Sequence, residues 1–126
     1  KAVNDRYGHA TGDAILREIT ALVADSLRLP DTLARWGGEE FMVLLPETDR
    51  AGALELAERL REAVVAREFR GPGEVTVSLG VAQHRAQEPL KTLLKRVDDA
   101  LYRAKEGGRD RVEAAIHTAA EDDQGA

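Results

Sequence analysis

The stretch LARWGGEEFMVLL, residues 33–45, decides how this chain folds. Two runs with strand-forming residues, 33–36 and 40–45, lie on either side of the pair Gly37-Gly38. Two adjacent glycines favour a two-residue turn, because the tight turns of β-hairpins need positive φ angles. The stretch therefore predicts an antiparallel hairpin with glycines at its tip.

Three segments around this hairpin have apolar residues at helical spacing and predict three helices. The first covers residues 13–28, where Thr11 and Asp13 supply side chains suited to a helix start. The second covers residues 50–66, and the third covers residues 90–106. We expect all three helices to pack an apolar face on a sheet.

Two further segments predict strands. Apolar residues alternate with small or polar ones over residues 75–81, and residues 111–114 predict a short last strand. The resulting order of helix, hairpin, helix, strand, helix and strand fits an α+β fold. We expect one domain over residues 1–114 and a polar, disordered tail over residues 115–126.

The composition indicates an ordinary soluble domain and excludes several classes of protein. The chain has 126 residues, of which 43% are apolar and 33% charged. A net charge of -5 argues against nucleic-acid binding, and the absence of cysteine excludes disulfides and thiolate metal sites. No apolar run reaches the roughly 18 residues of a membrane span, and we expect no signal peptide. We therefore expect a cytoplasmic location.

The turn Gly37-Gly38-Glu39-Glu40 is the strongest candidate for a chemical site. Two glycines leave room for a phosphate to approach the backbone. Two carboxylates beside an open turn suit a hard cation such as Mg²⁺, which takes oxygen ligands and shares them with substrate phosphates. The alternative is an ordinary hairpin with solvated glutamates, and these four residues alone favour that alternative.

With Phe41, the turn resembles the signature of the GGDEF family of diguanylate cyclases, in its GGEEF form. Five further segments resemble parts of that family and follow in the expected order, from residue 1 to about residue 112. They are KAVND (1–5), YGHATGD (7–13), RW (35–36), SLGVA (78–82) and the span from DDALYRAK to GRD (98–110). Ordered matches of this kind are much more specific than one pentapeptide.

The resemblance implies a palm-like, ferredoxin-like α+β domain with helices on a mixed, partly antiparallel sheet. It implies condensation of two GTP molecules into cyclic di-GMP with release of pyrophosphate. The family acts as a homodimer that uses Mg²⁺ or Mn²⁺, and each subunit holds one GTP. A sensor domain N-terminal to this one is implied for the parent protein.

The family's acidic and glycine residues carry over to matching positions at the hairpin tip. Glu39 matches the metal-binding acid of the signature. Glu40 matches its neighbour, which lies close to the metals and has a less defined role. Gly37 and Gly38 match the turn on the phosphate side.

Other nucleotide contacts carry over to both ends of the chain. Asn4 and Asp13 match the pair that reads guanine, and an amide and a carboxylate suit that base edge. Lys1, Lys105 and Arg109 match residues that contact the triphosphate. Two ordinary roles compete with this assignment: Asp13 suits a helix start, and Lys105 and Arg109 suit the end of a helix.

A second motif lies upstream of the hairpin. Arg28-Leu29-Pro30-Asp31 matches the family's RxxD motif, including its spacing to Gly37. In the family this inhibitory site binds the product, cyclic di-GMP, and Arg59 matches a further residue used there. Arginine suits a guanine edge because its fork makes two parallel hydrogen bonds.

The chain departs from the family pattern before Lys1, where the family has a first core strand with a metal-binding Asp. Either this chain is a fragment of a longer protein, which we favour, or its gene is shortened. A site that keeps only the Glu39 carboxylate should hold Mg²⁺ weakly, so we expect the 126-residue chain to be a poor cyclase. An unpaired sheet edge should also promote abnormal oligomers or lower stability.

Two other functions stay open. A cyclic di-GMP receptor would bind the product at Arg28 and Asp31 without turning over GTP. A dimerisation or scaffold module would bind neither nucleotide.

Overall fold

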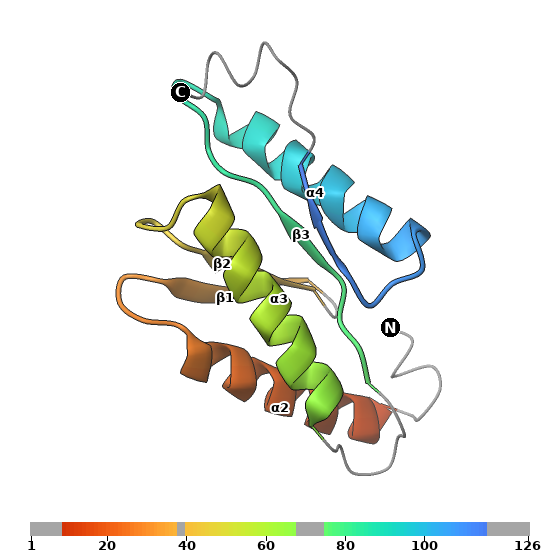
Figure 1. The fold of residues 1–126 in the computed structure, drawn as a ribbon. Coiled ribbons are helices and arrows are strands. Elements are labelled where there is room, and N and C mark those ends of the chain that lie inside the picture. Colours follow the sequence, from red (N-terminus) through yellow and green to blue (C-terminus); the bar gives the residue numbers. More distant parts are fainter. Residues whose placement is uncertain (1–8, 38–39, 68–74, 116–126) are drawn as a thin grey trace. The chain divides into compact units, whose positions relative to one another are not determined.

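A computed structural model describes residues 9–37, 40–67 and 75–115. A hairpin of two strands and two later strands are interspersed with three helices along the described chain (Figure 1). Their order is α2 (His9–Ser26), β1 (Thr32–Gly37), β2 (Glu40–Leu44), α3 (Arg50–Ala66), β3 (Leu79–Val81), α4 (Leu90–Glu106) and β4 (Val112–Ala114). The predicted α+β class is confirmed.

The chain divides into two compact units, and α3 contributes to both of them. The first unit comprises residues 1–48 and 62–76, and the second comprises residues 49–61 and 77–126. Each unit has its own small sheet among the described residues, with β1 and β2 in the first and β3 and β4 in the second.

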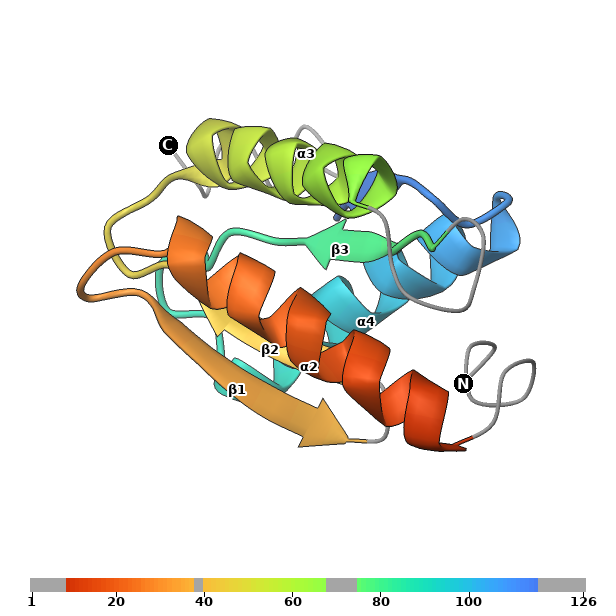
Figure 2. The same ribbon diagram turned by 90° about the horizontal axis from the view of Figure 1, so that it is seen from below.

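The first unit contains the predicted hairpin. β1 and β2 pair antiparallel from Thr32 opposite Leu44 to Gly37 opposite Glu40, and Figure 2 shows them as adjacent arrows. The register shifts between Arg35 and Gly37, which marks a bulge or irregularity just before the tip. The core of this unit consists of the buried aliphatic side chains Ile15, Ile19, Val64 and Val75.

The second unit pairs β3 with β4 in parallel, and both strands lie against α4 (Figure 1). The approach of β3 to α4 depends on Gly80, because a Cβ at that position would lie 2.5 Å from the backbone nitrogen of Leu101. Small residues of α4 fill the same region, since Ala100 and Ala104 are fully buried. Other buried residues of this unit are Leu56, Ala57, Leu60 and Ala115.

The ends of α3 and α4 agree with the sequence prediction, because both helices carry recognisable end signals. Asp49 precedes α3, and its Oδ1 accepts a hydrogen bond from the amide of Gly52 at 2.9 Å. Pro89 precedes α4, and Gly107 follows the last residue of that helix.

Three local predictions were wrong. α2 covers His9–Ser26 instead of residues 13–28, so Asp13 lies inside the helix and Arg28 lies beyond its end; apolar spacing marks only the buried part of a helix. Gly37 ends β1 and pairs with Glu40, so Gly37 belongs to the strand ladder instead of the predicted turn. The strand predicted over residues 75–81 covers only 79–81, since its ladder extends no further than the three residues of β4.

None of the helices in the described ranges combines the length and apolar character needed to cross a membrane. The predicted tail, residues 115–126, lies outside the described residues except for Ala115. The disorder of that tail stays a prediction.

Candidate functional site

Gly37, the last residue of β1, has open space around its backbone. A Cβ added at Gly37 would meet no other heavy atom within 4 Å, so this part of the tip leaves room for a ligand. Glu40 begins β2 directly across from Gly37 and is half-buried. The tip residues Gly38 and Glu39 lie outside the described residues, so the role of Glu39 as a metal ligand stays a prediction.

Asp13 projects from α2 as an exposed side chain of the first unit. The alternative that Asp13 caps the helix start does not hold, because α2 begins four residues earlier at His9. Two other predicted nucleotide contacts, Lys1 and Asn4, lie outside the described residues.

Lys105 lies in the last turn of α4 and Arg109 follows the end of that helix, both in the second unit. Gly108 adopts φ +120°, and its amide donates to the carbonyl of Lys105 at 3.4 Å. The amide of Arg109 donates to the carbonyl of Ala104 at 2.9 Å. This pair of hydrogen bonds is the Schellman arrangement, which satisfies the last carbonyls of a helix through the backbone alone. The end of the helix therefore needs no cap from the side chain of Arg109, which is exposed.

The RxxD motif forms a tight turn before β1. The amide of Asp31 donates to the carbonyl of Arg28 at 2.6 Å, and the amide of Arg28 donates to Asp31 Oδ2 at 3.2 Å. The other carboxylate oxygen, Oδ1, is buried without a hydrogen-bond partner among the described residues. Arg28 is exposed in this turn, and Arg59 is exposed on α3 in the second unit.

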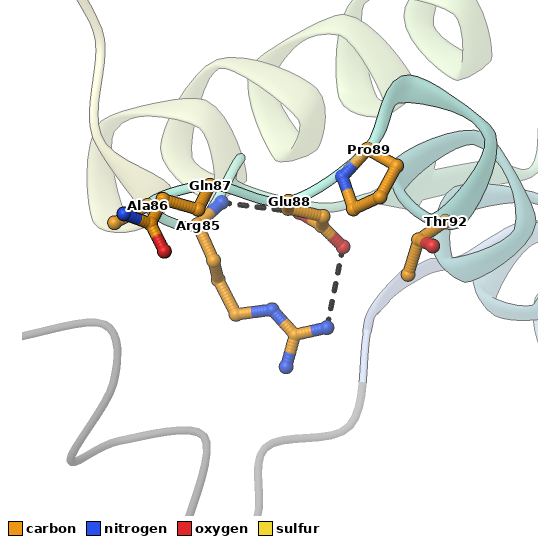
Figure 3. Close-up of a pocket in the computed structure, with 6 residues that line it drawn as sticks. All are labelled: Arg85, Ala86, Gln87, Glu88, Pro89 and Thr92. Carbon is orange, nitrogen blue, oxygen red and sulfur yellow. Dashed lines mark hydrogen bonds and ion pairs between the residues drawn. The ribbon is translucent and has the colours of Figure 1, made fainter.

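A separate pocket lies before α4 and is lined by residues 85–89 and Thr92 (Figure 3). Its central contact is the Glu88 carboxylate, which Arg85 approaches in the figure and which accepts a hydrogen bond from Arg96 Nε at 2.7 Å. These contacts lower the pKa of Glu88 to about 2, mainly through the hydrogen bond from Arg96. Since the charges inside this pocket already compensate one another and no predicted site residue lines it, we assign it a structural role.

Within the described ranges, no three acidic or histidine side chains come together as a metal site. The donor set at the hairpin tip is still chemically suited to Mg²⁺, because Glu39 and Glu40 both offer carboxylate oxygens. Substrate phosphates and water would complete such a site, as they usually do for this ion.

The sequence did not predict the ion pair between Arg61 and Asp110, which lies next to Arg109 in the chain. Arg61, on α3, donates a hydrogen bond from Nη1 to Asp110 Oδ1 at 2.8 Å. Asp110 directly follows Arg109 in the chain. Helical periodicity and local motifs could not reveal this contact, because 49 residues separate its partners.

The comparisons with known proteins identify the class of domain. The family model "Diguanylate cyclase, GGDEF domain" matches residues 1–111. The active GGEEF domain of a diguanylate cyclase from Vibrio cholerae has a similar structure, with a TM-score of 0.84 and 29% identity; the match covers 93% of this chain and 76% of that one. The palm-like α+β fold predicted above is thereby confirmed.

This chain belongs to the GGDEF domain family. It is 49% identical to the diguanylate cyclase DgcM of Escherichia coli over 115 residues, which are 91% of this chain and 28% of DgcM. The GGDEF domain of DgcB from Caulobacter crescentus, solved in complex with cyclic di-GMP, matches with a TM-score of 0.83 and 35% identity over 90% of this chain and 70% of that one. The chain spans less than a third of the length of the curated relatives it matches.

Proposed function

We propose that this GGDEF domain serves a diguanylate cyclase, which condenses two GTP molecules into cyclic di-GMP and releases pyrophosphate. The observation that carries the proposal is the GGEEF turn, with its open backbone at Gly37, in a chain 49% identical to the cyclase DgcM over 115 residues. The reaction joins the 3′-hydroxyl of one GTP to the α-phosphorus of the other. Because each GTP supplies one nucleophile and one electrophile, we propose that a homodimer brings two such domains face to face.

The residues of this chain mainly bind and orient GTP. Asn4 and Asp13 read the guanine edge, and Lys1, Lys105 and Arg109 neutralise the triphosphate. Correct placement of the two reacting groups lowers the barrier by removing the entropy cost of their encounter. Glu39 and Glu40 would hold Mg²⁺ or Mn²⁺, and such an ion, when bound, polarises phosphoryl oxygens and makes the attacking hydroxyl more acidic.

The preference of the 126-residue chain for GTP over ATP tests this proposal, and this measurement does not depend on catalytic turnover. Calorimetry with GTP and with ATP, each with Mg²⁺, should show a preference for GTP. The variant Asp13→Ala should lose most of that preference, because a carboxylate accepts from the two guanine donors that adenine lacks. Asp25→Ala is a matched control, since Asp25 is another exposed aspartate of α2.

The proposal is wrong if the chain binds ATP and GTP equally, or if Asp13→Ala and Asp25→Ala behave alike. Product formation is measured separately, by chromatography of reactions with GTP and Mg²⁺. We expect little cyclic di-GMP from this chain alone, because Glu39 is the one carboxylate within residues 1–126 that the family resemblance matches to a metal ligand. Rapid synthesis would contradict that expectation and would leave the cyclase assignment standing.

A second proposal concerns the RxxD turn, which we infer to bind cyclic di-GMP. It is supported by the exposed Arg28 side chain in this turn, because a guanidinium group can make two parallel hydrogen bonds to a guanine edge. Cyclic di-GMP should therefore bind to this chain, and Arg28→Ala should abolish binding. Arg17→Ala, a change of another exposed arginine in the first unit, is the control.

The same titrations separate the remaining alternatives. Product binding without any GTP binding would identify a receptor. A chain that binds neither nucleotide would be a dimerisation or scaffold module. We further propose that a sensor domain in the parent protein controls the pairing of two GGDEF domains.

A further inference from the structure

The contact between Arg61 and Asp110 joins α3 to the loop that carries a predicted triphosphate ligand. Arg61 Nη1 lies 2.8 Å from Asp110 Oδ1, and the side chains are 20% and 40% exposed. Both residues belong to the second unit of the chain. Asp110 directly follows Arg109, so this contact fixes the backbone next to the Arg109 side chain.

The loop needs such a contact because its backbone is in an unfavourable conformation. Three consecutive residues have positive φ: Gly108 at 120°, Arg109 at 63° and Asp110 at 46°. Glycine accepts this region freely, whereas residues with a Cβ occupy it at a cost in free energy. Hydrogen bonds to the end of α4 hold the amides of Gly108 and Arg109, but the left-handed residues Arg109 and Asp110 lie beyond that helix. A contact from a neighbouring element therefore helps to keep them in one conformation.

A hydrogen bond to Glu58 within α3 also orients the Arg61 side chain. Its Nε donates to Glu58 Oε1 at 3.0 Å, one helical turn earlier on α3. The pKa of Arg61 is raised by the hydrogen bonds to Glu58 and Asp110, so the guanidinium keeps its charge at every accessible pH. The guanidinium group is planar, and one of its edges is already hydrogen-bonded to Glu58 on the same helix. It is therefore pre-organised to bind a second carboxylate.

The Arg109 side chain remains available for a ligand. It is exposed, and within the part of the chain that the structure describes it forms no ion pair. The neighbouring Arg111 Nε donates to the carbonyl of Arg109 at 3.3 Å, so the main chain of Arg109 is held on both sides. The guanidinium therefore projects from a fixed backbone.

We propose that Arg61 is a positioning residue, which acts through Asp110 to hold Arg109 in the orientation that binds the triphosphate of GTP. The inference rests on the proposed function, because it requires that Arg109 contacts phosphate. It assigns Arg61 and Asp110 to nucleotide binding although neither belongs to the GGEEF turn or to the RxxD motif.

The test compares dissociation constants of GTP and GMP, both with Mg²⁺, in the 126-residue chain. Their ratio isolates the contribution of the β- and γ-phosphates, which general destabilisation of the fold does not change. Arg61→Ala should weaken GTP binding by roughly three- to tenfold and leave GMP binding unchanged, as expected when a contact that orients a binding group is lost. Arg67→Ala is the control, since Arg67 pairs with Glu18 at 2.8 Å in the first unit.

Variants of Asp110 test the same contact from its other side, so the inference can be tested even if Arg61→Ala does not fold. Asp110→Ala should reduce the GTP preference as Arg61→Ala does, whereas Asp110→Asn should keep most of it, because the amide oxygen still accepts from Arg61. In an Arg109→Ala background, Arg61→Ala should have no further effect on the ratio. Residues that act through one another show this lack of additivity.

The outcomes separate this inference from the proposed function. If Arg109→Ala lowers the GTP preference while Arg61→Ala and Asp110→Ala do not, the positioning role is refuted and the cyclase assignment stands. If the unchanged chain binds GMP as tightly as GTP, both the triphosphate contact and the positioning role are refuted.

Discussion

Replacement of Glu88 by glutamine should destabilise the second unit through loss of one compact cluster of charges. The Glu88 side chain is 3% exposed, and its carboxylate accepts from Arg96 Nε at 2.7 Å and from the amide of Arg85 at 3.1 Å. Arg96 Nη2 donates to the same carboxylate at 2.9 Å. Arg85 Nη2 donates to it at 3.2 Å, a contact that is drawn in Figure 3. Glutamine keeps the shape but replaces one acceptor oxygen by a donor that faces two guanidinium groups.

The pKa of Glu88 sets the size of this effect. The hydrogen bond from Arg96 is the largest cause that lowers this pKa from 4.5 to about 2. That difference corresponds to about 3 kcal/mol of stability. Solvent reaches the rim of the cluster and screens the charges, so we expect a measured loss of about 2 kcal/mol.

The sign of the pH dependence follows from the lowered pKa. Because the folded state binds the Glu88 proton more weakly than the unfolded state, the stabilisation is complete above pH 4.5 and is lost as the pH falls through about 2. The difference between the parent chain and Glu88→Gln should therefore be largest at pH 7. At pH 3 it should be less than roughly half as large.

Urea denaturation followed by circular dichroism measures both quantities. At pH 7 we expect the midpoint of Glu88→Gln to fall by roughly 1 M, from the usual dependence of unfolding free energy on urea. Asp99→Asn is the control, because Lys95 and Asp99 form an exposed pair on α4 at 3.3 Å that should contribute less than about 0.5 kcal/mol. Equal effects of the two variants, or a loss that does not shrink between pH 7 and pH 3, would refute the reasoning.

Two further predictions concern stability. Gly80→Ala should lower the free energy of unfolding by about 2–3 kcal/mol. The new Cβ would lie 2.5 Å from Leu101 N and 2.7 Å from Val97 O, which are backbone atoms of α4 and can shift only if the helix moves. A thermal midpoint equal to that of the parent chain would contradict this. Asp49→Ala should cost about 1 kcal/mol, because it removes the 2.9 Å hydrogen bond to the amide of Gly52 at the start of α3. Asp49→Asn should recover most of that loss, and urea titration of both variants checks the order.

Local signals in the sequence predicted most of the elements. α3 and α4 have the predicted bounds because Asp49, Pro89 and Gly107 act on the backbone within a few residues of each helix end. The hairpin was predictable for the same reason, since the Gly37-Gly38 pair and its flanking strands form a continuous stretch. The start of α2 was placed too late, because residues 9–12 carry no apolar periodicity that could mark a helix.

The family and the candidate nucleotide residues also came from the sequence, because the GGEEF turn and the ordered segments around it are contiguous motifs. Asp13, Lys105 and Arg109 could be named from those motifs alone. Their convergence with Glu39 on one nucleotide stays a prediction.

Tertiary structure alone decided which distant residues meet. The Arg61–Asp110 pair, the parallel pairing of β3 with β4 and the contact of Gly80 with the backbone of α4 join positions that no periodicity connects. Such contacts form because many weak packing interactions add up in the folded chain, and no single local preference of the sequence encodes that sum. The sequence by itself therefore determined the elements, the family and the chemistry of the candidate ligands. The fold determined how the loop that carries Arg109 is held.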